Sequence, residues 1–408
     1  MSTPTASTPS SLSMGRSPLF VTGKNNALAN DQLDSMTLQL KIYNGLKASP
    51  PATANYSLSK NYSINEVINF EVSDLVRSEF YHDFSVWNDI GYTQSPQGEA
   101  LWVSPIGDWV YSNNGAAPES AVWATGSSLA FLATDGWATR DNIAPVAVSQ
   151  PVLATSRNRQ VLVGNYESLA INNSSTNALA NIVISWQSGD SDDFYVSAVS
   201  AAPPDRTTNN SQNLVIYAGV GPANLENNSF LDNAIKPSSQ PDGGVGQYYD
   251  VILKNAGNTT IGTVRYYVQC EAKYTPVQVA FINRFGVADF ITFFKRSDES
   301  GTFTQDSYQK SIYNDGFTTP SLEVGKYQSY NVNSRNTLTL NTGFVDQNYD
   351  ETIEDILMSE YVAVYTNSNW VSAVPNRGTI EYQKSVNTKL INYTMSFDFG
   401  FDERSLVR

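Results

Sequence analysis

Histidine and cysteine are nearly absent from this sequence. Its 408 residues include one histidine, His82, and one cysteine, Cys270. A Ser-His-Asp or Cys-His catalytic arrangement would have to use His82, and the Gly-x-Ser-x-Gly motif of a nucleophile elbow does not occur. A structural zinc site needs four Cys or His ligands, so that class of site is excluded. We therefore interpret His82 as a surface or capping residue.

The single cysteine also excludes an intrachain disulfide, which is typical of a chain assembled in a reducing compartment. Cys270 continues a period-two alternation with Val264, Tyr266 and Val268. Alternate residues of a strand share one face. We therefore expect Cys270 to be a buried, unreactive thiol on the inward face of a strand.

Charged residues are scarce at 16% of the chain, and acids exceed bases by 39 to 25, which gives a formal net charge of -14. Without a Lys/Arg-rich run, such a surface repels phosphate, so no nucleic-acid partner is expected. No apolar stretch approaches the roughly 20 residues of a membrane-spanning helix, so no membrane partner is expected either. Residues 1–14 lack the apolar core of a signal peptide, and we interpret residues 1–16 as a disordered tail.

A first group of clustered acids comprises Asp190, Asp192 and Asp193. Glycosidases need two carboxylates held apart across a cleft. The crowding of these acids beside Gly189 is more typical of an exposed turn before a strand. We therefore predict no catalytic residue here.

A second group, Asp346, Asn348 and Asp350, begins like an EF-hand calcium loop. Position six should be glycine and is Glu351, while position twelve should be glutamate and is Leu357. We interpret Asp350 as a helix cap, although a looser oxygen-ligand site stays open. Glycine loops that cradle phosphate are missing as well. The sequence predicts no metal site and no cofactor.

Alternating apolar and polar residues are abundant, and they indicate half-buried strands. Clear examples are Met36–Ile42, Ile68–Val72, Ile182–Trp186, Thr337–Leu340 and Ile391–Phe399. The 23 tyrosines and 18 phenylalanines also favour sheet, since aromatic side chains pack well on a pleated surface. Turn-forming clusters such as Asn113-Asn114-Gly115 separate the strands.

Helical periodicity is rare. It is clearest over residues 350–360, where Ile353, Ile356 and Leu357 share a face, and a shorter helix is expected from Asp74.

We therefore predict an all-β chain of several β-sandwich domains with one or two short helices. The predicted domains are residues 17–148 with a Trp-rich insertion, residues 149–273 as a β-sandwich, and residues 274–408 with the short helix near 350–360.

Tryptophan is concentrated in one part of the chain. Five of the seven tryptophans lie between residues 87 and 137, namely Trp87, Trp102, Trp109, Trp123 and Trp137. Indoles on loops can anchor a protein interface or stack on sugar rings, and they can equally fill a domain core. These five residues are the candidate binding or interface residues.

Residues 273–296 read KYTPVQVAFINRFGVADFITFFKR. This block resembles one found in uncharacterised virion structural proteins of marine tailed bacteriophages. Parts of residues 17–75 and 341–394 resemble the same family. Within the block, Asn283–Gly286 is predicted to be a turn in which Gly286 takes positive φ and Asn283 bonds its own backbone. Phe290, Phe293 and Phe294 are predicted to fill the core of the third domain.

The resemblance implies a non-enzymatic structural protein of the virion, assembled in the host cytoplasm. We expect a tail, baseplate or tail-adaptor component that forms a symmetric homo-oligomer and contacts other virion proteins. The alternatives are a receptor- or glycan-binding module of a phage fibre, which would bind a host surface glycan, and a neck- or capsid-associated protein. A polysaccharide-cleaving enzyme is a third hypothesis.

Overall fold

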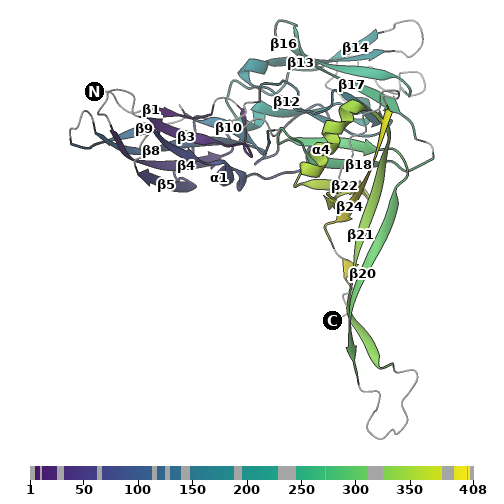
Figure 1. Ribbon diagram of the computed structural model, residues 1–408. Coiled ribbons are helices and arrows are strands. Elements are labelled where there is room, and N and C mark those ends of the chain that lie inside the picture. The colour runs from purple at the N-terminus through teal and green to yellow at the C-terminus, as the bar shows by residue number, and fades with distance from the viewer. Residues whose placement is uncertain are drawn as a thin grey trace. The chain divides into compact units, whose positions relative to one another are not determined.

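The computed structural model describes residues 5–9, 12–24, 32–61, 67–112, 117–124, 129–138, 148–187, 195–227, 245–271, 273–310, 325–378, 390–401 and 403–404 (Figure 1). In these residues strands dominate, and α4 (Asp350–Met358) is the only helix longer than five residues. The predicted all-β fold class is confirmed. No helix among these residues is long and apolar enough to cross a membrane.

The chain forms two compact units. Unit 1 comprises Met1–Cys270, Ala280–Ile291 and Asn348–Ser359, and unit 2 comprises Glu271–Val279, Thr292–Gln347 and Glu360–Arg408. These units do not coincide with the three consecutive ranges that the sequence predicted.

The first part of unit 1 is a β-sandwich. One sheet has the strand order β2-β10-β8-β4-β5, with β9 also pairing β8, and the other has the order β1-β3-β6. The elements are β1 (Thr5–Ser7), β2 (Leu12–Met14), β3 (Phe20–Lys24), β4 (Gln32–Tyr43), β5 (Tyr56–Asn61), β6 (Val67–Glu71), α1 (Ser73–Arg77), η1 (Ser85–Asn88), β8 (Ala100–Ser112), β9 (Glu119–Ala124) and β10 (Phe131–Thr134). A buried apolar cluster that includes Val21, Leu38 and Phe70 fills the space between the sheets.

The second part of unit 1 is another β-sandwich, with sheets β11-β17-β16-β13-β14 and β12-β15-β7. Its elements are β7 (Tyr92–Gln94), β11 (Asn158–Leu162), β12 (Ser168–Asn172), η2 (Ser175–Asn177), β13 (Leu179–Gln187), β14 (Tyr195–Val199), α2 (Ser211–Leu214), β15 (Val215–Gly219), α3 (Pro222–Glu226), β16 (Tyr248–Asn255) and β17 (Thr260–Gln269). Both sheets contribute to one core around Trp186 and Tyr249. Strand β7 precedes this region in sequence but pairs with β15, which ties the two sandwiches into one unit.

Unit 1 also takes in the middle of a later hairpin. Strands β18 (Val277–Ile282) and β19 (Ala288–Phe293) flank the turn 283–286, and residues 280–291 of this hairpin belong to unit 1. Helix α4 belongs to unit 1 as well, and it buries Ile353 and Ile356 as its periodicity predicted. Asp350 is the first residue of this helix and not its N-cap, which is Tyr349, so the capping interpretation is wrong.

Unit 2 is built on the strand order β22-β23-β24-β21-β20, with β25 pairing β21. Its elements are β20 (Asp298–Gln309), β21 (Tyr327–Asp346), η5 (Gln347–Tyr349), β22 (Val362–Thr366), β23 (Asn369–Pro375), β24 (Leu390–Phe399) and β25 (Glu403–Arg404). The Phe293 and Phe397 rings meet edge to face at 5.9 Å. Phe290, Phe293 and Phe294 are all buried, as predicted, although Phe290 belongs to unit 1.

The alternating segments fall in strands with their apolar residues buried, because a strand that covers a core must present one face to it. The buried residues are Met36, Leu38, Leu40 and Ile42 in β4, Ile68 and Phe70 in β6, Ile182, Ile184 and Trp186 in β13, Leu338 and Leu340 in β21, and Ile391, Tyr393, Met395 and Phe397 in β24. The predicted short helix after residue 72 is α1.

Two further predictions from the sequence are wrong. Cys270 is exposed, because β17 ends at Gln269 and the alternation that buries Val264, Tyr266 and Val268 stops there. The predicted tail at residues 1–16 contains two strands. Strand β2 pairs in parallel with β10 and buries Leu12 and Met14, so this segment is part of the first sandwich. Asn113–Gly115 and the acids Asp190, Asp192 and Asp193 lie outside the described residues.

Candidate functional site: a buried polar network and an exposed β-arm

The tryptophans of the 87–137 window occupy different surroundings. Trp87, Trp102 and Trp109 are buried, Trp137 is partly buried, and the side chain of Trp123 is outside the described residues. Trp87 packs edge to face on Tyr166 at 5.2 Å, while Trp109 belongs to the core of the first sandwich. The window is therefore not one exposed aromatic surface, and its role in an interface or in glycan binding stays a prediction.

His82 is not a surface residue. Its imidazole is fully buried and its Nε2 lies 3.0 Å from Oδ2 of Asp135. Asp135 also accepts two hydrogen bonds from Arg16, at 2.7 and 2.6 Å. Burial would raise the pKa of Asp135, but the hydrogen bonds and charges of Arg16 and His82 lower it below its ordinary value. The interpretation of His82 was wrong because a buried carboxylate far away in sequence supplies its partner.

A second buried ion cluster joins three segments of unit 1. Arg159 on β11 donates hydrogen bonds to Glu167 and to Asp289 on β19, and all three side chains are at most 4% exposed. Burial alone would lower the pKa of the Arg159 guanidinium, but the attraction of the two carboxylates raises it well above its ordinary value. Breaking such a cluster by removing one charge leaves the others uncompensated, which typically costs about 3–5 kcal/mol.

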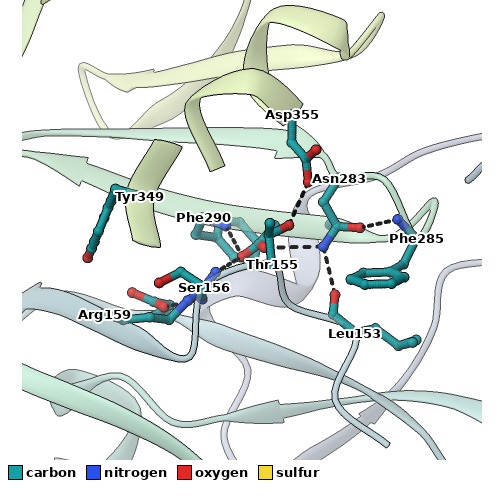
Figure 2. Close-up of polar contacts among 12 residues, drawn as sticks. Leu153, Thr155, Ser156, Arg159, Asn283, Phe285, Phe290, Tyr349 and Asp355 are labelled. Carbon is teal, nitrogen blue, oxygen red and sulfur yellow. Dashed lines mark hydrogen bonds and ion pairs between the residues drawn. The ribbon is translucent and has the colours of Figure 1, made fainter. Parts of the chain in front are cut away.

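The turn 283–286 is fixed by this cluster (Figure 2). Asn283 donates from Nδ2 to the carbonyl of Leu153 at 2.7 Å and to Asp289 at 3.1 Å. Its Oδ1 accepts from the backbone N–H of Phe285 at 3.0 Å, and Gly286 has φ of 77°, so both turn predictions are confirmed.

Helix α4 is held to the same region through Asp355, which Figure 2 shows directed toward Thr155. Asp355 accepts from the Thr155 hydroxyl at 2.5 Å and from Nε of Arg284 at 2.9 Å. Burial raises the pKa of Asp355 to about 6 although Arg284 opposes this shift. These pairings could not be predicted from the sequence, since Thr155, Arg284 and Asp355 are far apart along the chain.

The volume of the cavity beside the ion cluster limits which molecules the cluster can bind. The cavity beside Arg159, Glu167 and Tyr349 has a volume of about 10 Å³. One water molecule needs about 10–15 Å³ of such space. The cluster is therefore suited to fixing the fold of unit 1, and it leaves no space for a reacting molecule.

The most exposed regular element among the described residues is a two-stranded arm in unit 2, formed by residues 298–309 of β20 and 327–336 of β21 (Figure 1). Every residue of β20 is exposed. Phe303 is 73% exposed, Tyr327 71% and Tyr330 51%. The arm thus exposes large aromatic side chains along its length, which favours an interaction site.

The outer backbone edge of β20 in the arm also has no described strand paired with it. Strand β20 is the last strand in its sheet, so no described strand covers its outer edge. Strand β24 pairs with β21 only from Thr337 to Asp346, and β25 adds pairs at Asn333 and Ser334. Beyond that point the described part of the arm is a hairpin of two strands, with the Tyr308 and Tyr330 rings in contact at 5.7 Å. No strand was predicted for residues 298–309, although their mostly polar sequence without a clear apolar face was a usable signal.

Comparison with known proteins gives no family. No family model and no curated protein matches the chain. Among solved structures, trypsin-activated alpha-2-macroglobulin from Escherichia coli is similar at a TM-score of 0.20 and 10% identity, over 96% of this chain and 21% of that one. The chain thus spans about a fifth of the length of that protein. Similarity at this level implies nothing about function.

Proposed function

We propose that the chain is a non-enzymatic structural component of a tailed-phage virion, in the tail, baseplate or tail adaptor, and that it assembles as a symmetric oligomer. The resemblance of residues 273–296 to phage virion proteins supports this proposal. The observation that carries it is the exposed arm of β20 and β21, because no described strand gives that arm the contacts that normally stabilise a hairpin.

An isolated two-stranded hairpin is marginally stable in water, and three strands or a packed face are needed for stability. The arm has neither beyond Asn333 among the described strands. A long exposed edge is also a template for pairing with another chain. A neighbouring copy that adds a strand to β20, or that covers Phe303 and Tyr327, would supply both missing contacts.

Shortening the arm tests this role. Thr304 pairs with Asn333, so replacing residues 305–332 by Asn-Gly closes the hairpin at an existing pair with a two-residue turn. We expect the full chain to form a closed oligomer and the shortened chain to be a folded monomer in sedimentation velocity. Circular dichroism of the shortened chain checks that the sheets remain.

A double substitution distinguishes the contribution of the exposed aromatic side chains from that of the hairpin's length. Phe303→Ser with Tyr327→Ser removes two exposed rings and should weaken association, while Tyr81→Ser removes a ring that is 65% exposed elsewhere and should not. Copy number in purified virions gives the second measurement. A single copy per particle, or an unchanged oligomer after shortening the arm, would refute the proposal. Stable monomers of the full chain would favour the fibre-module alternative.

A further inference from the structure

A pocket of about 420 Å³ lies in unit 1. Ligand pockets typically have volumes of about 300–1,000 Å³. Its apolar wall is buried and is formed by Leu12, Ala130, Phe131, Leu132 and Leu214 together with Trp102. Its polar lining residues are Asn172, Ser174, Ser175, Thr176, Thr207 and Asn209. The remaining two lining residues are Lys47 and Arg206.

The charge of this pocket is opposite to that of the chain. The net charge of the protein is -14, yet the described residues that line the pocket include no acid. The Lys47 ammonium lies 5.3 Å from the centre of the Trp102 ring, and it has no carboxylate partner among the described residues. Arg206 donates to the Leu179 carbonyl at 3.4 Å, which is a weak contact for a guanidinium. The pKa of the nearest acid in sequence, exposed Asp205, is lowered by hydrogen bonds from Thr207 and also by the charge of Arg206.

Neutral donors complete the lining. Trp102 is 5% exposed, and its Nε1–H has no acceptor within the described part of the chain. A buried donor without a partner destabilises the fold. The side chains of Ser174, Ser175 and Thr176 make no hydrogen bond to a described residue, and the last two are exposed. Such hydroxyls match the hydroxyl groups of a sugar.

We propose that this pocket binds a carboxylated sugar, such as a uronic or sialic acid residue. The carboxylate lies between Lys47 and Arg206, the sugar hydroxyls bond to Ser174, Ser175 and Thr176, and the C–H face of the ring rests on the apolar wall. The pairing of two cations with hydroxyl donors and an apolar wall favours this class over a neutral sugar, which would offer no carboxylate to either cation. The inference does not depend on the assembly role of the arm.

Titration calorimetry of the full chain with glucuronate and N-acetylneuraminate tests the proposal, with glucose as the neutral probe and inorganic phosphate as the anion without a ring. We expect one of the two acids to bind at least about 10-fold more tightly than glucose, which carries no charge for Lys47 and Arg206, and than phosphate, which has no ring for the apolar wall.

Lys47→Met and Arg206→Met should each weaken that binding about 10-fold or more. Lys60→Met is the matched control, since the Lys60 ammonium also lies 5.3 Å from an aromatic ring, that of Phe70, outside the pocket. Thermal unfolding of each variant shows that the fold is kept. Equal binding of glucose would refute the role of the cations, equal binding of phosphate would refute the sugar, and absence of binding by both acids would overturn the proposal.

Discussion

Glu99 is a residue at which burial and ionisation oppose each other. Its Oε1 accepts from the Tyr217 hydroxyl and from the backbone N–H of Ala288 at 3.0 Å, while its Oε2 has no partner among the described residues. Burial raises its pKa from 4.5 to about 8, against these hydrogen bonds. Between the two values the folded chain holds a proton that the unfolded chain has released. Stability therefore falls as pH rises through this window, by up to about 1.4 kcal/mol per pH unit.

We predict that Glu99→Gln makes unit 1 less sensitive to pH across this window and more stable at its alkaline end. Glu79→Gln is the matched control, because exposed Glu79 also accepts from a tyrosine hydroxyl, that of Tyr56 at 2.8 Å. Urea midpoints near both ends of the window measure the effect. Tryptophan fluorescence reports unit 1, since only Trp370 lies outside it. Equal pH slopes for wild type and Glu99→Gln would show that Glu99 is ionised in the folded chain.

The ion-pair and hydrogen-bond partners of individual buried residues could not be predicted from the sequence. Arg159, Glu167 and Asp289 come together only after β11 and β19 are in place, and no local pattern connects them. His82 shows the same limit, because its partner Asp135 is 53 residues away. Composition gives the number of ionisable groups, but it carries no information on which of them are buried.

Strands were predicted well where one face of the strand packs on a core. The alternation in β4, β13 and β24 specified both the strand and its buried face, since a slip of one residue would expose every apolar side chain. Strand ends were not specified in this way. The pattern through Val268 gave no sign that β17 ends before Cys270, and the polar residues near Leu12 concealed a short strand.

The turn between β18 and β19 offers a test at the element scale. Gly286 has φ of 77°, and a Cβ there would lie 2.2 Å from the Gly136 nitrogen. Gly164 has φ of 84° with open space around it. We predict that Gly164→Ala costs about 1–2 kcal/mol, the usual penalty for a left-handed residue. Gly286→Ala should cost clearly more, because the adjoining backbone must also move.

Urea unfolding monitored by tryptophan fluorescence compares these two variants. The Thr134 hydroxyl bonds to the Phe285 carbonyl at 2.7 Å and the Trp137 N–H bonds to the Arg284 carbonyl at 2.8 Å, so movement of the turn would disturb both contacts. If the two alanine variants lose equal free energy of unfolding, the close approach of the new Cβ to Gly136 is relieved without destabilising the fold.

At the scale of the whole molecule, the three predicted domains became two units because contacts cross the expected boundaries. Strand β7 joins the sheet of the second sandwich, and residues 280–291 and 348–359 belong to unit 1. These exchanges are long-range pairings, which composition shifts along the sequence cannot indicate.

The net charge of -14 gives the assembly proposal a salt dependence. Copies of one chain carry the same charge, and the arm adds Asp298, Glu299 and Asp306 to its own surface. Their repulsion extends over about 30 Å at about 0.01 M salt but only about 3 Å at about 1 M. Aromatic burial and backbone pairing are screened far less.

We therefore predict that self-association strengthens as salt rises, whereas binding of a carboxylated sugar at Lys47 and Arg206 weakens. Sedimentation velocity and calorimetry across this salt range measure the two trends, with the arm-shortened chain as the control that should stay monomeric throughout. Association that weakens with salt would show that charge pairs, and not the exposed edge and aromatics of the arm, hold the copies together.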